Sequence, residues 1–226
     1  LVWRAVIRRE APGTRGGVTL VIRLVAGDDR LELEYRFDKE WTLEPESVLI
    51  EFPLALSRES VTRFVGGALA PFRADADQAP GANRNWYTME RWADVHDVAG
   101  GLNLFSVDAP LVQFGSPGSD PIVTGWRERG DPSPVIYSYL MNNYWETNYR
   151  AAQEGPHAIR YVLRPHGGFE LTHAERTGLE SAHPLLAYRA KSDLSPIDPP
   201  VQVEARRSLP TLLRKTSKSL EIAIYN

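Results

Sequence analysis

The sequence contains no cysteine, and this absence excludes disulfide frameworks, thiolate metal sites and cysteine nucleophiles. A strong excess of charge is missing too, because the net charge is only −3 at pH 7 and the isoelectric point is near 6.0. Proteins that bind nucleic acid or anionic membranes usually carry a basic surface. We therefore expect neither a nucleic acid nor a membrane as a partner.

Long apolar runs are also missing. No segment approaches the roughly 20 consecutive apolar residues of a membrane span, and we expect no signal peptide in the first residues of this sequence. The chain starts without a methionine, and it stops at Asn226 within a segment, "SLEIAIYN", whose pattern is that of a strand. We interpret the sequence as a piece of a longer protein.

Extended segments dominate what is present. They are rich in β-branched residues or alternate apolar with polar residues, and they cover 17–25, 30–37, 47–56, 83–97, 101–115, 134–149 and 157–166. Turn residues such as Gly-Asp-Asp at 27–29 separate them, and 116–134, rich in glycine and proline, is expected to be a surface loop. Many strands joined by such turns predict an all-β fold, a large antiparallel β-sandwich with little helix.

One helix is expected, over 172–190. Thr172 is its expected N-cap, because Glu175 follows three residues later at the spacing of a capping box, and Pro184 should end or bend it. We expect the β-sandwich domain to occupy residues 1–190. Residues 191–226 should form a linker and a C-terminal strand segment, either a returning strand or the start of a further small β module.

The segment "NRNWYTMERWADVHD" at 83–97 mixes aromatic rings with charge. With the two-residue period of a strand, one face would carry Trp86, Thr88, Glu90, Trp92, Asp94 and His96. The other face would carry Tyr87, Met89, Arg91, Ala93 and Val95. Rings combined with hydrogen-bonding acids suit a sugar, but they equally suit a strand that is buried on both sides.

A second aromatic and polar cluster, "MNNYWETNYR" at 141–150, contains Trp145. The same two interpretations apply to it. Tryptophan and tyrosine in sandwich strands often belong to the core, and buried polar groups often satisfy the backbone at a strand end.

Signals for catalysis are weak. The five histidines lack metal-ligand spacing, and there is no nucleophile elbow, phosphate loop or dinucleotide fingerprint. Glu90 and Asp94 would lie about 13 Å apart along a strand, beyond the roughly 5–9.5 Å between glycosidase carboxylates. Asp108 or Glu146 on a neighbouring strand would be needed for a closer pair. We expect no catalytic residue and no metal site in this chain.

Four stretches together resemble a known family. In order, "ESVLIEFPLAL", "NRNWYTMERWADVHD", "GGLNLFSVDAPLVQFG" and "YLMNNYWETNYRAAQEGPHAIRYVLRPH" resemble the C-terminal β-region of glycoside hydrolase family 38, the α-mannosidases, and bacterial members in particular. The resemblance spans roughly residues 17–190. It implies a β-sandwich of the type shared with galactose mutarotases, packed behind a catalytic α/β barrel.

In that family the barrel carries the nucleophilic aspartate, the acid and most zinc ligands, and its motifs are missing here. The resemblance therefore implies a non-catalytic region that supports the barrel and completes its sugar pocket. Its partners would be a mannoside-type carbohydrate and an upstream catalytic domain of the same chain. Zinc would be held by that domain and no cofactor by this one, and the location would be the bacterial cytoplasm.

The resemblance also suggests substrate-binding residues. The family closes its pocket with an arginine in a strand motif that ends in Arg-Arg, and within "MERW" the equivalent position is Arg91. The second residue of the motif is Trp92 here, which is a departure from the family. The chemistry of the side chains, rather than the resemblance, adds Glu90, Trp86, Trp92 and Trp145 to the set of expected sugar contacts.

Two other functions remain open. A free-standing carbohydrate-binding module would use Trp86, Trp92 and Trp145 as stacking platforms. A mutarotase-like epimerase would need one histidine and one carboxylate at the same cavity. For the epimerase the acid would be His96 or His157, and the base would be Glu90 or Glu146.

Overall fold

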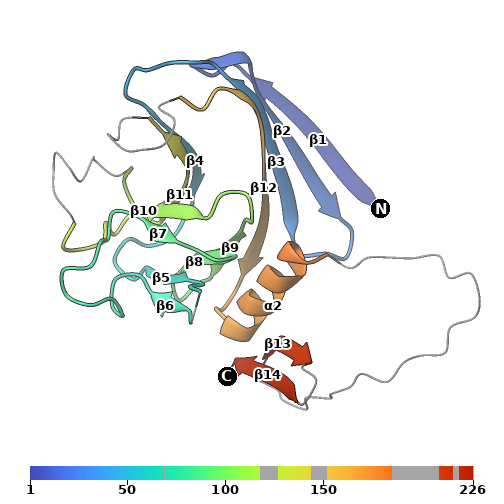
Figure 1. Cartoon of the computed structure of the whole chain (residues 1–226), viewed down its shortest axis with the longest axis vertical. Helices are drawn as coiled ribbons and strands as arrows, with labels where there is room; N and C mark the ends of the chain where they lie inside the picture. Colours follow the sequence, from blue (N-terminus) through green and yellow to red (C-terminus); the bar gives the residue numbers. More distant parts are fainter. Residues whose placement is uncertain (69, 118–126, 144–151, 185–208, 216–218, 226) are drawn as a thin grey trace, which may run out of the picture. The chain divides into compact units, whose positions relative to one another are not determined.

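The computed structural model describes the chain except residues 69, 118–126, 144–151, 185–208, 216–218 and 226 (Figure 1). The chain divides into two compact units, Leu1–Phe169 and Glu170–Asn226. The expected domain boundary at residue 190 lies outside the described residues and stays a prediction.

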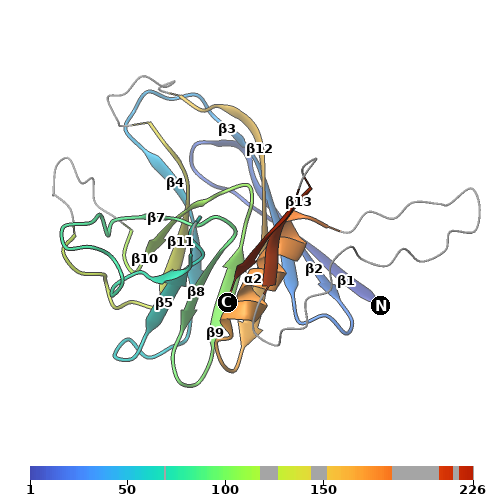
Figure 2. The same ribbon diagram turned by 60° about the horizontal axis from the view of Figure 1, so that its bottom comes forward.

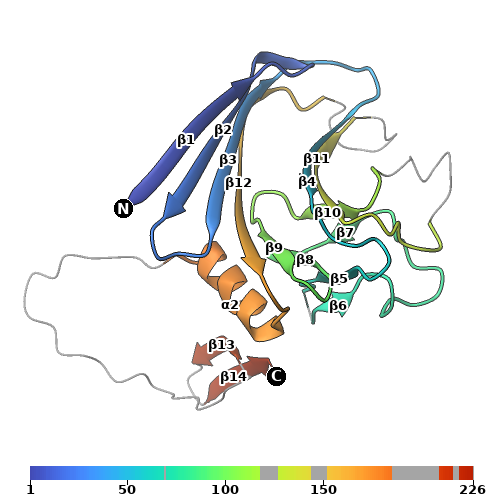
Figure 3. The ribbon, with the colours of Figure 1, turned by 180° about the vertical axis from the view of Figure 1, so that it is seen from behind.

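The first unit contains a sheet of eight strands in the order β1-β2-β3-β12-β9-β8-β5-β6 (Figures 1 and 3). Their bounds are β1 Val2–Arg9, β2 Thr14–Val25, β3 Leu31–Lys39, β12 Gly155–His166, β9 Gly101–Phe105, β8 Trp92–His96, β5 Thr62–Val65 and β6 Phe72–Arg73. All neighbouring strands in this sheet are antiparallel. Strands β5, β8 and β9 lie side by side in Figure 2.

A second sheet of four strands has the order β4-β11-β10-β7. Its strands are β4 Ser47–Pro53, β11 Val135–Asn142, β10 Leu111–Phe114 and β7 Tyr87–Thr88. Side chains of both sheets form one buried core, in which Phe52 of the smaller sheet meets Tyr161 of the larger with ring centroids 5.1 Å apart. The predicted antiparallel β-sandwich is confirmed.

Strand β3 shows why the alternating sequence gives a sandwich. Leu31, Leu33 and Tyr35 belong to the core or pack against it. Between them, Glu32 pairs with Arg23 of β2 at 2.8 Å on an exposed face. One side of the strand is thus buried and the other is in water, as the two-residue period requires.

The expectation of one continuous strand over 83–97 is wrong. The segment forms β7 in the smaller sheet and β8 in the larger sheet, and the chain crosses the core between them. At the crossing, the Met89 N–H donates to the carbonyl of Pro110 at 2.8 Å, and the Glu90 N–H donates to that of Gly66 at 2.7 Å. The fully buried Met89 explains the break, because its side chain fills the space between the sheets. The segment 101–115 likewise divides into β9 and β10.

The second unit contains the predicted helix, α2 Leu171–Ala182. Its N-cap is Glu170, without a side-chain hydrogen bond, so the capping role expected of Thr172 is wrong. The helix ends two residues before Pro184, as proline requires. In the tail, β13 Leu209–Lys215 and β14 Leu220–Tyr225 pair in antiparallel orientation.

Among the residues that the structure describes, no helix has the length and apolar character needed to cross a membrane.

Candidate functional site

A groove opens between the two sheets where β2 and β3 lie opposite β4 and β11. Its volume is about 520 Å³, within the range of small-molecule sites. It is lined by Ala11, Pro12, Thr14, Val18, Tyr35, Phe37, Lys39, Glu46, Ser47, Val48, Leu49, Ile50, Glu51 and Leu140. Rings, hydroxyl groups and charged groups therefore face one space.

The register of β2 and β3 brings the rings into the groove. Val18 lies opposite Phe37 and Leu20 lies opposite Tyr35, so these residues share the face of the sheet that looks toward β4. Tyr35 also meets Tyr161 edge to face, with centroids 5.9 Å apart, and burial raises the pKa of its hydroxyl. A neutral, partly buried phenol can act as a hydrogen-bond donor to a ligand in the groove.

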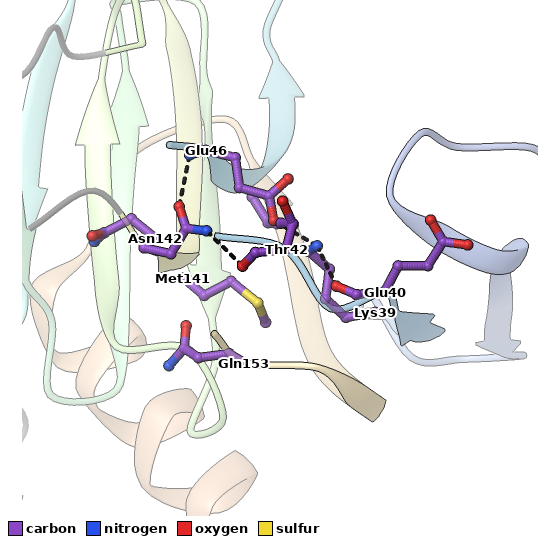
Figure 4. Close-up of a pocket in the computed structure, with 9 residues that line it drawn as sticks. Lys39, Glu40, Thr42, Glu46, Met141, Asn142 and Gln153 are labelled. Atoms are coloured by element: carbon purple, nitrogen blue, oxygen red, sulfur yellow. Dashed lines mark hydrogen bonds and ion pairs between the residues drawn. The ribbon is translucent and has the colours of Figure 1, made fainter. Parts of the chain in front are cut away.

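One end of the groove holds a lysine and a glutamate. Lys39 Nζ lies 2.5 Å from Glu46 Oε1, and it donates to the carbonyl of Glu40 at 2.8 Å (Figure 4). The Lys39 side chain is only 5% exposed, whereas Glu46 is 35% exposed. The buried ammonium therefore holds a carboxylate that still reaches solvent.

The backbone around Glu46 is fixed from the smaller sheet. Asn143 accepts the N–H of Glu46 at 2.7 Å through Oδ1 and donates to the carbonyl of Thr42 at 3.2 Å through Nδ2. A small adjoining pocket shares Lys39, Glu46 and Val48 with the groove. These contacts order the loop before β4, so the carboxylate position is set before any ligand arrives.

The groups that line the groove have the chemistry that hydroxyl groups and C–H surfaces of a ligand require. A carboxylate accepts hydrogen bonds from neighbouring hydroxyl groups, and an ammonium donates to them. Aromatic faces pack against C–H surfaces, which leaves the edges of the ligand for polar contacts. Lys39 and Glu46 compensate each other's charge, and Glu51 adds a second carboxylate to the lining of the groove.

Glu90 and Arg91, both expected to bind substrate, pair with each other at 2.6 Å directly before β8. The Arg91 side chain is 18% exposed and that of Glu90 is 41% exposed. Neither residue lines the groove. Their role in sugar binding stays a prediction.

The three expected tryptophan platforms have different positions. Trp92 is 1% exposed and packs against Phe169, with ring centroids 5.9 Å apart. Its indole also fills the space beside Gly66, where an added Cβ would lie 2.5 Å from Nε1. Trp92 therefore has a packing role in the described structure. Trp86 is half-buried, and Trp145 lies outside the described residues.

The outer face of β8 carries a buried polar cluster that we define as Asp94, His96, Asn103 and His166. The fully buried Asp94 carboxylate meets His96 Nδ1 at 2.5 Å and His166 Nε2 at 2.7 Å, and Asn103 Nδ2 donates to it at 2.6 Å. Phe169 stacks on His96 with a centroid distance of 5.0 Å. The cluster satisfies the carboxylate without exposing it to solvent.

The sequence offered one signal for this cluster and one for the groove. Asp94 and His96 are two residues apart, hence on one strand face, but the partner His166 lies 72 residues away. Lys39 follows Tyr35 and Phe37 on the inward face of β3, and a charged residue in such a series marks a buried polar site.

Asp108, considered for a carboxylate pair, is instead held by Arg160 at 2.8 Å, which lowers the pKa of its carboxyl.

In the part of the chain that the structure describes, no group of three or more histidine, aspartate or glutamate residues is placed to hold a metal ion.

Comparison with known proteins gives no family. No family model matches the sequence, and no curated protein matches it. A TPR-domain containing protein from Parabacteroides distasonis ATCC 8503 is similar over 87% of this chain and 36% of its own, with 10% identity and a TM-score of 0.40. A protein assigned as an aldose 1-epimerase from Escherichia coli K12 is similar over 73% of this chain and 65% of its own, with 11% identity and a TM-score of 0.34.

The chain thus spans less than two thirds of either of these proteins. TM-scores of 0.40 and 0.34 assign neither a family nor a function.

Proposed function

We propose that this chain is the non-catalytic β-sandwich region of an α-mannosidase-like glycoside hydrolase, and that it binds part of a mannoside-type sugar in the groove between its sheets. The observation that carries the proposal is the groove itself. It places the Lys39–Glu46 pair beside the aromatic residues Tyr35 and Phe37 in a space of about 520 Å³. The ordered series of sequence stretches that resemble the α-mannosidase β-region supports the same function.

The polar groups of the groove support binding better than catalysis. Glu46 is held by Lys39 at 2.5 Å, and Glu51 accepts a hydrogen bond from the Tyr137 hydroxyl at 3.3 Å. Glycoside hydrolysis needs one carboxyl group as acid and a second as base or nucleophile, both directed at the same bond. Carboxylates that are already held by donors are suited to accept hydrogen bonds from the hydroxyl groups of a ligand. The catalytic residues would belong to a separate domain.

Binding to the groove is tested with the change Glu46→Gln. We expect methyl α-mannoside to bind the unchanged chain weakly and the Glu46→Gln variant at least about tenfold more weakly, because a charged hydrogen-bond acceptor is lost. Isothermal titration calorimetry measures both affinities, and a thermal unfolding scan of each protein confirms that it is folded.

Glu44→Gln is the matched control. Glu44 lies two residues earlier, is exposed and does not line the groove, so its replacement should leave the affinity unchanged. An unchanged chain without affinity for the sugar, or an equal loss in the two variants, would contradict the proposal.

An epimerase is a second candidate because a histidine lies beside the groove. His157 stacks on the groove residue Phe37, with centroids 5.2 Å apart and an interplanar angle of 25°. His96, the other proposed acid, has Asp94 as its carboxylate partner, and Glu146 lies outside the described residues. NMR exchange between the α and β anomers of a free sugar, measured with and without the protein, distinguishes the candidates. Catalysed exchange that His157→Ala abolishes would favour the epimerase.

A further inference from the structure

The backbone edge of strand β4 opens into the groove. β4 is at one end of the smaller sheet and pairs only with β11 among the described residues. Five consecutive residues of this strand, 47–51, line the groove. Successive residues of a strand point to opposite faces, so a space that touches all of them runs along the edge of the backbone.

The hydrogen-bond phase of β4 decides which backbone groups face the groove. At one end of the strand the Asn143 N–H donates to the carbonyl of Glu46 at 3.2 Å, and at the other end the Leu54 N–H donates to the carbonyl of Pro134 at 3.0 Å. Hydrogen-bonded pairs alternate along an antiparallel ladder, so both ends show that the even-numbered residues of β4 bond to β11. The odd-numbered residues therefore direct their N–H and C=O groups away from β11. These residues are Ser47, Leu49 and Glu51.

The edge of β4 has features that oppose pairing with another strand. Within the described residues no hydrogen bond reaches its outward backbone groups. The next position of the row is Pro53, which has no N–H, and the neighbouring β11 has a bulge between Tyr139 and Met141. Short rows, prolines and bulges are the means by which natural edges avoid recruiting a strand. The open groups thus suit a small ligand with hydroxyl groups better than a polypeptide.

The Lys39 end of the groove keeps one donor for a ligand. An ammonium has three N–H donors. Glu46 and the carbonyl of Glu40 accept from Lys39, and no further described residue does so. Because the lysine side chain is only 5% exposed, solvent replaces the third acceptor poorly. A sugar hydroxyl beside Glu46 can accept from the ammonium and donate to the carboxylate.

Tyr35 lies at the opposite end of the groove. Its ring and the ring of Phe52, which follows Glu51 on β4, both contact Tyr161, with centroids 5.9 and 5.1 Å away. Tyr35 lines the groove, and its hydroxyl forms no hydrogen bond with a described residue. It precedes Lys39 by four positions on β3, about 13 Å at a rise of about 3.3 Å per residue.

We propose that the groove has two sugar subsites in line along β4, one beside the Lys39–Glu46 pair and a second beside Tyr35. A single pyranose ring is less than half as long as the separation of about 13 Å, so it contacts only one end, whereas two linked units reach both. The second unit also meets the open backbone groups of Leu49 and Glu51. This inference rests on the proposed function and adds the second subsite to it.

Calorimetry with sugars of one and two units tests the second subsite. The probes are methyl α-mannoside and the methyl glycosides of several α-linked mannobioses. We expect at least one mannobioside to bind about tenfold more tightly than methyl α-mannoside, because it adds the contacts at the Tyr35 end. If every mannobioside binds no more tightly than the monosaccharide, the second subsite is refuted and the proposed function stands. If none of the sugars binds, both are refuted.

Tyr35→Phe removes the hydroxyl of the second subsite and keeps the ring. We expect about fivefold weaker binding of the mannobioside and unchanged binding of methyl α-mannoside, because one neutral hydrogen bond is lost at one end only. Glu46→Gln should weaken the binding of both sugars. Tyr137→Phe is the matched control, since the Tyr137 hydroxyl donates to Glu51 at 3.3 Å and Tyr137 does not line the groove. Equal losses for the two sugars in Tyr35→Phe would mean a single subsite and overturn the proposal.

Amide hydrogen exchange, measured by NMR, reports the backbone contacts in the unchanged protein. Without ligand we expect slow exchange at Ile50 and Phe52, which bond to β11, and faster exchange at Leu49 and Glu51. Saturation with the mannobioside should slow exchange at Leu49 and Glu51, and methyl α-mannoside should not. Unchanged exchange at these two amides would contradict binding along β4. Slowing only by an extended peptide of alternating valine and threonine would show that the edge pairs with a strand, which would also overturn the proposal.

Discussion

Replacing Asp94 by alanine should lower the free energy of unfolding by about 3–5 kcal/mol. The carboxylate is fully buried and accepts from both imidazoles of the cluster and from the Asn103 amide. Alanine would leave those three donors without an acceptor inside the protein. A buried donor that loses its partner carries the full desolvation penalty, about 1–3 kcal/mol for each group.

Urea denaturation followed by tryptophan fluorescence measures this loss. Asp77→Ala is the control, because Asp77 forms its ion pair with Arg73 at 2.7 Å on the exposed surface, and its removal should have a much smaller effect. Asp94→Asn should fall between the two, since the amide keeps one acceptor oxygen. A change for Asp94→Ala as small as that for the control would contradict the role given to the cluster.

Replacing Trp92 by alanine should also cost about 3–5 kcal/mol of stability. The side chain is 1% exposed and lies between the glycine at position 66 and the ring of Phe169. Truncation would leave a cavity that closes only in part, because β8 is paired on both sides, with β5 and with β9. The loss would arise from packing, and it would occur whether or not a sugar is present.

Trp41→Ala provides the comparison, since Trp41 is 60% exposed and its removal should change stability little. Calorimetry with methyl α-mannoside, at a temperature where the variants stay folded, separates packing from binding. We expect the Trp92→Ala chain to keep its sugar affinity, because Trp92 does not line the groove. A selective loss of affinity with unchanged stability would restore Trp92 as a sugar platform.

The sequence predicted the regular parts of the fold well, for physical reasons. The segment "RLELEYRF" alternates apolar with charged residues, as expected for a strand with one buried and one solvent-exposed face. In the structure this segment lies in β3, Leu31–Lys39. The helix around residue 175 was predicted from its period, but its first residues were not, because the structure begins it after Glu170 without a side-chain cap.

The two-residue period of the sequence did not predict the point at which the chain passes from one sheet to the other. The pattern at 83–97 is compatible with one strand, yet Met89 takes the backbone across the core from β7 to β8. A local pattern contains no information about which sheet a strand joins. That choice depends on partners such as Pro110 and Gly66, which are distant in the sequence.

The candidate site was missed for the same reason. The groove combines β3 with β4 and with Leu140 of β11, and its key pair unites the end of one strand, at Lys39, with the loop before the next, at Glu46. The aromatic residues of 83–97 and 141–150 predicted tryptophan platforms instead. The more informative signal was a lysine on the inward face of an apolar strand.

We propose that this β-sandwich binds a sugar and that the reactive groups belong to another domain of a longer polypeptide. The most direct measurement is the hydrolysis of an aryl α-mannoside by the 226-residue chain alone and by the chain joined to its upstream region. We expect no release of the aryl group above background from the chain alone, and turnover from the joined protein. Turnover by the chain alone, abolished by substitution of its own carboxylates, would contradict the account.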